Sequence, residues 1–188
     1  MKFTSQLALA AVFALGAAGA SAQQKLVPAQ SDIAFTSKQM GVSVDGRFKK
    51  FDAQIALDPK KPESSKIAFT IDLGSASLGA AETEAELAKS DWFNTKAFPQ
   101  ASFQSSSVKA TGGGKFDVAG KLTIKGNSQD VVVPVALSQA GANTTASGSF
   151  TIKRLDFKIG DGDWKDTSLV ANDVVVKVKL VMTGVGAL

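Results

Sequence analysis

Acidic side chains recur at two places in the 188-residue chain where their spacing resembles that of catalytic or metal-binding carboxylates. Glu82, Glu84 and Glu86 occupy alternate positions, but residues at i, i+2 and i+4 cannot all share one face of a helix. Compensation of a helix dipole explains them. Residues 161–166 (DGDWKD) resemble part of a calcium loop but lack its ligand order and its closing Glu. We therefore predict neither a catalytic carboxylate nor a metal site from these stretches.

A glycine-rich stretch at residues 112–115 (GGGK) resembles a phosphate-binding loop. Phe116, however, stands where such a loop has the Ser or Thr that contacts magnesium, so we interpret the stretch as a hairpin turn. The chain contains no His and no Cys, and thus lacks the commonest general base, the most frequent zinc ligand and any thiolate nucleophile. These observations predict a protein that is not an enzyme and has no metal or catalytic cofactor.

Arg154 is a candidate for binding an anionic group, because the alternation of apolar residues slips near it. Phe150 and Ile152 share one face of the expected strand, whereas Leu155 and Phe157 occupy the other. A β-bulge near Arg154 would join the two halves, and bulges are common at barrel rims and beside sites. An Arg at a rim can pair with a phosphate. The alternative is that the bulge displaces Arg154 to the surface.

Aromatic side chains gather in residues 90–103 (SDWFNTKAFPQASF), which contain Trp92, Phe93, Phe98 and Phe103 without a regular period. The whole chain has twelve Phe and no Tyr, and a Phe ring brings a large apolar surface with no polar group. Such rings suit the lining of a hydrocarbon-binding cavity. The alternative is that they plug the interior as ordinary core.

The segments that must position these residues alternate apolar and polar side chains with a period of two, as strands with one buried face do. Residues 115–125 show the pattern best, since Phe116, Val118, Leu122 and Ile124 alternate with polar or small residues. The pattern predicts eight strands, at residues 33–39, 51–57, 67–73, 101–108, 115–125, 131–137, 147–159 and 174–182. We expect an all-β fold in which they form an eight-stranded antiparallel barrel, wide enough for one small ligand, with a sandwich as the alternative.

Residues 80–89 (AAETEAELAK) break the strand pattern and predict one short helix, because they are rich in helix formers and begin with acidic residues. Its expected inward stripe is formed by Ala81, Ala85, Ala88 and Trp92. The helix and the aromatic loop fall between the third and fourth strands, where we expect them to form a lid or plug over one end.

Residues 1–22 have the order of a secretory signal: Met1-Lys2, an apolar run from Leu7 to Ala18, and the small residues Ala20-Ser21-Ala22. We expect cleavage after Ala22, export to the periplasm and a mature chain, residues 23–188, that forms a single domain. The formal net charge is +4, but the positive residues are scattered. This distribution argues against nucleic acid as a partner.

Several short motifs, in their order and spacing, resemble the YceI-like family of exported lipocalin-like barrels, which are known as polyisoprenoid-binding proteins. The matching stretches are residues 44–48 (VDGRF), 90–93 (SDWF), 120–126 (GKLTIKG), 154–157 (RLDF) and 172–174 (NDV). The resemblance covers nearly the whole mature chain. It implies an extended apolar tunnel that takes the prenyl chain of a prenyl diphosphate or a quinone. Exposed strand edges or a shared tunnel mouth could support a homodimer.

Together with the strand pattern, the resemblance indicates a set of inward apolar residues that contact the ligand: Phe48, Phe51, Ile55, Phe69, Trp92, Phe93, Phe98, Phe103, Phe116, Leu122 and Phe157. The family often has Lys-His where this chain has Lys38-Gln39, and Arg-Asp where it has Thr83-Glu84. The polar head bound here is therefore expected to differ from that of relatives. Lys38, Gln39 and Arg154 are the candidates to hold it.

We expect a non-enzymatic periplasmic carrier whose partners are an isoprenoid lipid or quinone and a membrane protein that exchanges it. Three alternatives share parts of the pattern. They are a small outer-membrane β-barrel, an exported enzyme that acts on a lipophilic substrate, and an interaction module whose aromatic loop docks on another protein.

Overall fold

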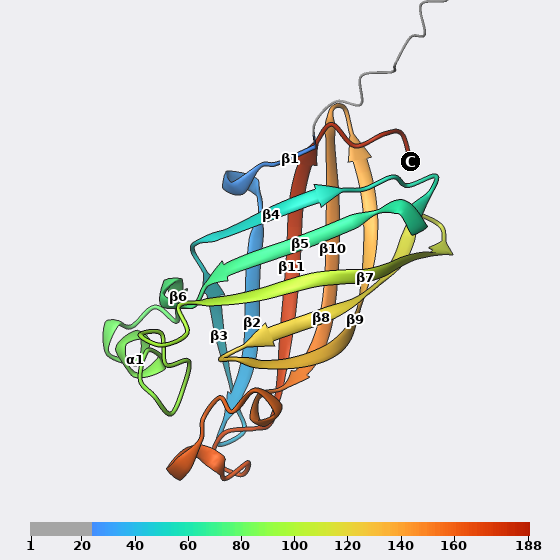
Figure 1. Ribbon diagram of the computed structural model, residues 1–188. Coiled ribbons are helices and arrows are strands. Elements are labelled where there is room, and N and C mark those ends of the chain that lie inside the picture. The colour runs from blue at the N-terminus through green and yellow to red at the C-terminus, as the bar shows by residue number, and fades with distance from the viewer. Residues whose placement is uncertain (1–23) are drawn as a thin grey trace, which may run out of the picture.

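The computed structural model describes residues 24–188, so the predicted secretory signal lies outside the described residues. Eleven strands make up this part of the chain (Figure 1). They are β1 (Lys25–Leu26), β2 (Asp32–Gln39), β3 (Val42–Phe48), β4 (Phe51–Ala56), β5 (Lys66–Asp72), β6 (Ala76–Ser77), β7 (Gln100–Gly112), β8 (Lys115–Ile124), β9 (Asn127–Ala140), β10 (Asn143–Lys153) and β11 (Asp173–Thr183).

Helical segments are short and lie between the strands. The one α-helix of the described residues is α1 (Ala81–Leu87), which confirms the predicted short helix. The 3₁₀ turns are η1 (Pro28–Gln30), η2 (Pro62–Ser64), η3 (Leu73–Ser75), η4 (Arg154–Phe157) and η5 (Gly162–Lys165). Among residues 24–188, no helix is long and apolar enough to cross a membrane.

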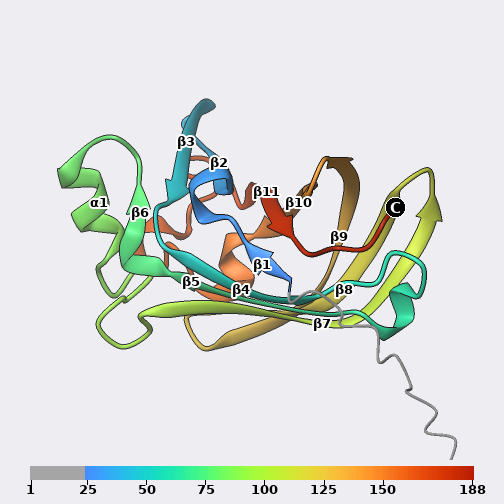
Figure 2. The same cartoon turned by 90° about the horizontal axis from the view of Figure 1, so that it is seen from above.

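The strands form one antiparallel sheet in the order β4-β5-β7-β8-β9-β10-β11-β2-β3-β6, with β1 added beside β11. The sheet curls strongly, so that β4, β5 and β7 cross in front of β2, β11 and β10 (Figure 1), and the view from above shows the two parts facing each other (Figure 2). The all-β antiparallel class is confirmed. The strand count of eight is wrong, because β3 and the short β1 and β6 join the sheet.

The sheet is a half-barrel and not the closed barrel that we expected. No ladder in the described part of the chain joins β4, at one end of the sheet order, to β3 or β6 at the other. The connection between β3 and β4, Lys49 and Lys50, is hydrogen-bonded to Ser75. The backbone N–H of Lys49 donates to the Ser75 carbonyl at 3.1 Å, and the N–H of Lys50 donates to the Ser75 hydroxyl at 3.0 Å.

The expected β-bulge near Arg154 is also wrong. β10 ends at Lys153, and the chain turns directly into η4, which Lys158 closes in the left-handed conformation with φ 56°. This turn explains why the alternation of apolar residues changes face, because residues beyond Lys153 no longer belong to the strand. The register shifts of the sheet lie instead between β7 and β8, at Ser105/Ser107 and Ala110/Gly112.

Tight turns connect most neighbouring strands. The stretch at residues 112–115 is a hairpin turn between β7 and β8, as predicted. The β2–β3 hairpin turns through Met40 and Gly41, which have φ values of 47° and 81°. A close approach explains a glycine within a strand: a Cβ at Gly120 would lie 2.5 Å from both the Phe103 ring and the Gln104 carbonyl oxygen.

Candidate functional site

The curled sheet encloses a cavity of about 580 Å³. Inward side chains of strands β2 to β5 and β7 to β11 line it, at every second position, as Val174, Val176 and Val178 do in β11. The polar side chains that reach the cavity are few: Ser37, Gln39, Glu82, Thr83, Glu86 and Arg154. The volume lies in the range of small-molecule sites, and the lining suits a hydrocarbon guest.

The interior is hollow. In β5 the inward residues Ile67, Phe69 and Ile71 are only half-buried, and so are Val174, Val176 and Val178 in β11. Residues in a solid core would be covered on all sides at native packing density. These side chains keep accessible surface because they border empty space, so the alternative of a ring-filled core does not hold for the centre of the sheet.

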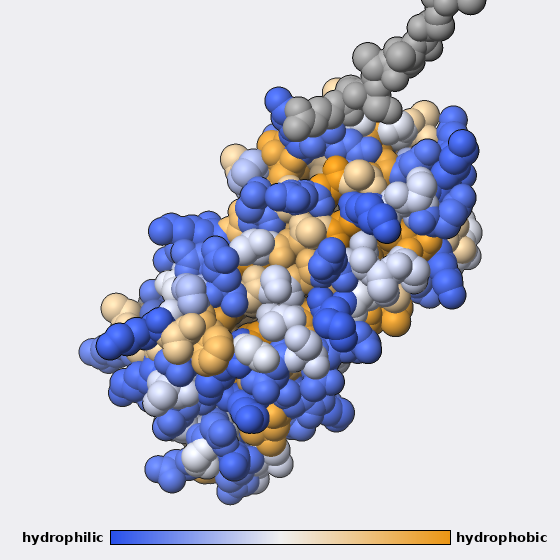
Figure 3. Space-filling view, in the orientation of Figure 1, coloured by the Kyte–Doolittle hydropathy of each residue, from blue (hydrophilic) through white to orange (hydrophobic). Residues whose placement is uncertain are grey.

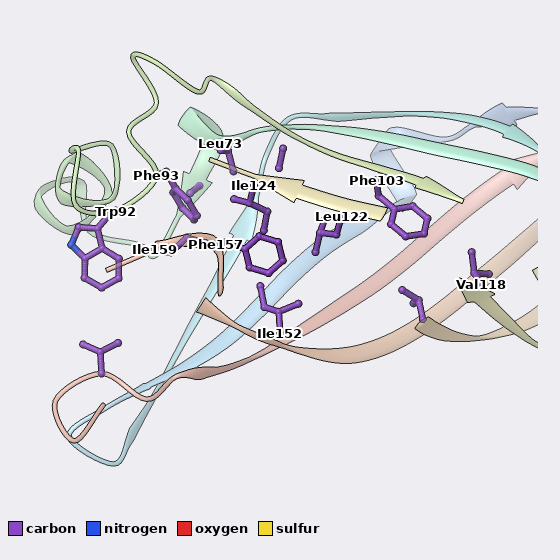
Figure 4. Close-up of a cluster of buried hydrophobic side chains, with 14 of the residues drawn as sticks. Leu73, Trp92, Phe93, Phe103, Val118, Leu122, Ile124, Ile152, Phe157 and Ile159 are labelled. Atoms are coloured by element: carbon purple, nitrogen blue, oxygen red, sulfur yellow. The ribbon is translucent and has the colours of Figure 1, made fainter. Parts of the chain in front are cut away.

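The chain after α1 carries Trp92 and Phe93 into the cavity. The N–H groups of Trp92 and Phe93 donate to the carbonyls of Lys89 and Leu87 at 3.1 and 3.0 Å, which folds this segment back onto the end of the helix. Both rings are about 8 % exposed. Figure 4 shows them at the α1 end of the buried cluster, with Leu122 and Phe103 further along the interior. Trp92 and Phe93 therefore line the cavity at its α1 end.

Aromatic contacts connect that end to the sheet. The ring centroids of Phe48 and Phe93 lie 6.1 Å apart, and those of Phe35 and Phe48 lie 5.4 Å apart. Both are tilted arrangements, which aromatic pairs favour. The Nε1 of Trp92 is buried and has no hydrogen-bond partner among the described residues.

Arg154 lies at the same end, 2 % exposed, and its guanidinium donates to five backbone carbonyls. The Nη1 atom donates to Ile159 and Gly160 at 2.8 and 2.7 Å. The Nη2 atom donates to Trp164 and Val170 at 2.6 and 2.7 Å, and Nε donates to Ala171 at 3.1 Å. An Arg side chain has five N–H groups, so all are used.

The charge of Arg154 has no acidic partner among the ion pairs of residues 24–188. Burial lowers the pKa of its guanidinium, but an Arg side chain keeps its proton in proteins. Carbonyl dipoles therefore solvate this cation. Through these bonds the side chain holds residues 159–160 and residues 164–171 close to each other.

The cavity opens between α1 and residues 162–170. Of the lining residues, Glu82, Thr83 and Trp164 are exposed, which marks them as the edge of the mouth. Gln39 and Glu86 lie beside them, and Glu86 is paired with Lys89. In the part of the chain that the structure describes, no three His, Cys, Asp or Glu side chains gather into a possible metal site.

Comparison with known proteins agrees with this geometry. The model of the YceI-like domain family matches residues 24–182. The chain belongs to the YceI-like family. The crystal structure of Burkholderia cenocepacia BcnA has 45 % sequence identity and a TM-score of 0.82 to this YceI-like protein, covering 84 % of this chain and 99 % of BcnA. The family resemblance in the sequence is thereby confirmed.

Two further relatives are more distant. A UPF0312 protein of Ectopseudomonas mendocina is 32 % identical over 120 residues, and the match covers 61 % of this chain and 63 % of that protein's length. A polyisoprenoid binding domain from Saccharophagus degradans is 17 % identical, with a TM-score of 0.69, and covers 86 % of this chain and 98 % of that one. At this low identity, the similarity to the Saccharophagus degradans domain shows only that the two folds are alike.

The structure brings most of the expected apolar site residues of this YceI-like protein together around the cavity: Phe48, Ile55, Phe69, Trp92, Phe93, Phe103, Phe116 and Leu122. Three others lie outside the lining. Phe157 is 1 % exposed within the core, and Phe98 lies against Gly126 at the surface. Phe51 faces a separate, shallow hollow beside Lys49 and Lys50.

Of the polar candidates for the head group, some border the cavity with a free polar group and others do not. Gln39 points into the cavity, whereas Lys38, its neighbour on β2, is exposed on the other face. The interpretation of Arg154 as a residue displaced to the surface is wrong, since it is buried. With every N–H group of Arg154 already bonded to a carbonyl, none remains for a ligand phosphate.

Sequence reasoning missed several lining residues. Phe35 continues the alternation Ile33, Phe35, Ser37, Gln39, so the strand pattern already contained it. The helix prediction chose the wrong face. Ala81 and Ala85 are exposed, and the helix instead presents Glu82, Thr83, Glu86 and Leu87 to the cavity.

Proposed function

We propose that this YceI-like protein is a non-catalytic binding protein that holds a polyisoprenoid or quinone-like lipid in its cavity. The observation that carries the proposal is the interior itself, about 580 Å³ of empty space bounded by aromatic and branched aliphatic side chains. Transfer of a prenyl tail from water into this interior gains about 25 cal/mol per Å² of apolar surface buried. Relative to a bilayer the gain is much smaller, so shape and head-group contacts must supply selectivity.

The fold supports the isoprenoid assignment. The domain from Saccharophagus degradans that has the same fold is described as a polyisoprenoid binding domain. In this chain we assign the tail to the interior between Trp92 and Met182, and the head group to the mouth near Gln39 and Thr83. Trp92 and Phe93 then contact the part of the ligand next to the head.

The charges at the mouth favour a neutral head group. Glu82 and Glu86 both border the cavity. Lys89 pairs with Glu86, but no ion pair of the described residues involves Glu82, and neither basic candidate compensates for it, because Lys38 faces away and Arg154 is fully bonded. A diphosphate would face like charges there. A quinone ring or an alcohol would accept hydrogen bonds from the Gln39 amide instead.

The alternatives fit the arrangement less well. Acid or base catalysis needs a titratable group held against the reacting atoms, but of the two carboxylates that border the cavity, Glu82 is exposed to solvent and Glu86 is paired with Lys89. An outer-membrane protein needs an apolar outer face, whereas exposed residues of the strands include Lys66, Lys109, Lys121 and Lys177. A carrier exported to the periplasm remains our proposal for its location, and cell fractionation tests it.

The test of binding is direct. The mature chain, residues 23–188, is purified from a prenyl-lipid-producing host, extracted with organic solvent and analysed by mass spectrometry. We expect a prenyl lipid in the extract, and uptake of added ubiquinone in preference to farnesyl diphosphate by the delipidated protein. Absence of any lipid, together with no uptake of either compound, contradicts the proposal.

A further inference from the structure

Four apolar side chains are exposed together beside the cavity mouth: Met40 at 76 %, Val42 at 67 %, Leu169 at 43 % and Trp164 at 37 %. We call them the apolar rim. The N–H of Met40 donates to the Leu169 carbonyl at 2.8 Å, and Gln39 forms a β-bridge with Val170. The β2–β3 hairpin and the segment around residues 154–170 lie at the lower end of the molecule in Figure 1, and Figure 3 shows hydrophobic surface at that end.

The conformation of Met40 is unusual for its residue type. Met40 and Gly41 both have positive φ, which a two-residue hairpin turn requires, and Asn-Gly is the sequence that satisfies it best. A methionine there adopts the left-handed conformation, which is energetically unfavourable for L-residues other than Asn and Asp. It also exposes a long apolar side chain to water. Neither turn geometry nor packing within the described residues accounts for a Met at this position.

The rim continues the lining of the cavity. In β2 and β3, Gln39 is directly opposite Val42, and Ser37 is opposite Val44, so all four side chains are on the inner face of the hairpin. Gln39 borders the cavity, and Val42 lies beside it on the neighbouring strand. Trp164 borders the cavity and the solvent at once. An apolar path therefore leads from the interior over the mouth to the tip of the hairpin.

Buried Arg154 fixes the shape of this rim. Its Nη2 atom donates to the carbonyls of both Trp164 and Val170. These two bonds hold the backbone at residues 164 and 170 in place beside the β2–β3 hairpin. The apolar side chains are thus presented by a rigid frame. Their exposure is a property of the folded chain and not of a loose loop.

We propose that the apolar rim docks the protein on a lipid bilayer, with Met40, Val42 and Leu169 inserted at the boundary between head groups and acyl chains and Trp164 at head-group level. Tryptophan prefers that depth. A protruding tip enters a bilayer without a complementary shape, which a protein partner would have to supply. Docking is argued from the rim alone and rests on the proposed lipid-binding function only for its biological role, which is to bring the mouth of the cavity to the membrane.

Charges near the rim have both signs: Lys38 and Lys165 are basic, and Glu82, Asp161, Asp163 and Asp166 are acidic. Lys165 is already paired with Asp161 at 2.9 Å. Electrostatic attraction to anionic lipid is therefore weak, and apolar insertion must supply the docking energy. We expect binding to neutral membranes that persists when salt screens surface charges.

The test uses phosphatidylcholine vesicles without prenyl lipid, and measures binding of the mature chain by flotation at low and high salt. We expect the wild type to float in both, and Met40→Asn to bind about tenfold more weakly because it loses inserted apolar surface. Asn suits the turn, so the thermal stability of this variant should equal or exceed that of the wild type. Val132→Asn is the matched control: Val132 is 56 % exposed on β9, away from the rim, and should bind like the wild type.

Trp164 supplies a second readout. The chain has two Trp residues, so Trp92→Phe leaves Trp164 as the sole indole, and this change removes a buried N–H that has no partner. We expect vesicles to shift the Trp164 emission to shorter wavelength and brominated lipid to quench it. No vesicle binding by the wild type, or equal binding by Met40→Asn, overturns the inference, as does pull-down of a protein through the rim without vesicle binding.

Docking and ligand binding fail separately. Uptake of ubiquinone from detergent solution needs the cavity but not the rim, so Met40→Asn should take it up like the wild type. Vesicle binding without any uptake would support docking and contradict the proposed function. Uptake without vesicle binding would support the proposed function and contradict docking.

Discussion

The Nη1 atom of Arg154 donates a 2.7 Å hydrogen bond to the carbonyl oxygen of Gly160, and a Cβ at residue 160 would collide with that same atom. Gly160 also has a φ of 70°, which favours glycine. The contact shows how closely residues 159–171 wrap the guanidinium. It also explains why a cation can be buried without a carboxylate, since five carbonyl dipoles replace its water.

Arg154→Lys should therefore destabilise the protein. A lysine keeps the charge but has only three N–H donors in another geometry, so buried carbonyls lose their partners. We expect a loss of about 3 kcal/mol in the free energy of unfolding, measured by chemical denaturation. Lys153→Ala removes the exposed cation of the preceding residue and should change the free energy of unfolding by less than about 1 kcal/mol. An Arg154→Lys variant as stable as the wild type would contradict this role.

Filling the cavity should remove ligand without harming the fold. Val176 lines the cavity on β11, and its neighbour Val175 is on the outer face. Val176→Phe places new volume in empty space, so we expect a stability change below about 1 kcal/mol and severalfold less bound lipid. Val175→Phe should retain the lipid. Mass spectrometry of solvent extracts and chemical denaturation measure the two quantities, and equal lipid content in both variants would argue against binding in the interior.

Gly120→Ala should disturb the packing of Phe103. The added Cβ would lie 2.5 Å from both the Phe103 ring and the Gln104 backbone, and a backbone atom moves less easily than a side chain. We expect a loss of about 1 to 3 kcal/mol in denaturant unfolding. Gly186→Ala meets no atom within 4 Å and should leave stability unchanged. Similar values for both changes would show that the close approach carries no cost.

The attachment of α1 should depend on pH through Glu84. Hydrogen bonds from the Ser77 hydroxyl and from the N–H groups of Leu78 and Gly79 lower the pKa of this carboxyl below 4.5. The carboxylate therefore stabilises the fold above pH 4.5, and this contribution disappears as the pH falls through the lower, folded-state pKa.

Glu84→Gln tests this dependence. At pH 7 the variant should unfold at a lower temperature than the wild type, and the difference should shrink as the pH falls through the lowered folded-state pKa, because the wild-type carboxyl then loses its charge too. Thermal unfolding by circular dichroism measures both proteins. A difference that does not change with pH would assign the effect to packing and not to the charge.

The sequence predicted those strands whose inner face is continuously apolar. β5, β8 and β11 each carry an apolar residue at every second position, because that face borders the interior. β3 escaped the pattern since its inner face includes Gly46, which has no side chain to contribute. That glycine is needed because the Phe35 ring occupies the space where its Cβ would lie.

The apolar part of the site was predictable for the same reason, whereas the polar part was not. Inward positions such as Phe69 and Leu122 follow from alternation. The contacts of Arg154 are all with backbone carbonyls, and carbonyls are the same in every residue, so no residue type in the sequence marks them. The face that α1 turns inward depends on Leu87 and on the fold of residues 88–93, which a seven-residue helix is too short to specify alone.

The missing ladder between β3 and β4 distinguishes this sheet from a cylinder of fixed bore. Enlarging a closed barrel requires whole strand pairs to separate. Here the β3 and β4 edges are joined at one end by their own connection, Lys49 and Lys50, which is hydrogen-bonded to Ser75, and at the far end of β4 Leu57 exchanges two hydrogen bonds with the Gln24 side chain. Parting them exposes little backbone and leaves every strand pairing intact. For the lipid binding that we propose, this open edge predicts that one scaffold accepts ligands of different width.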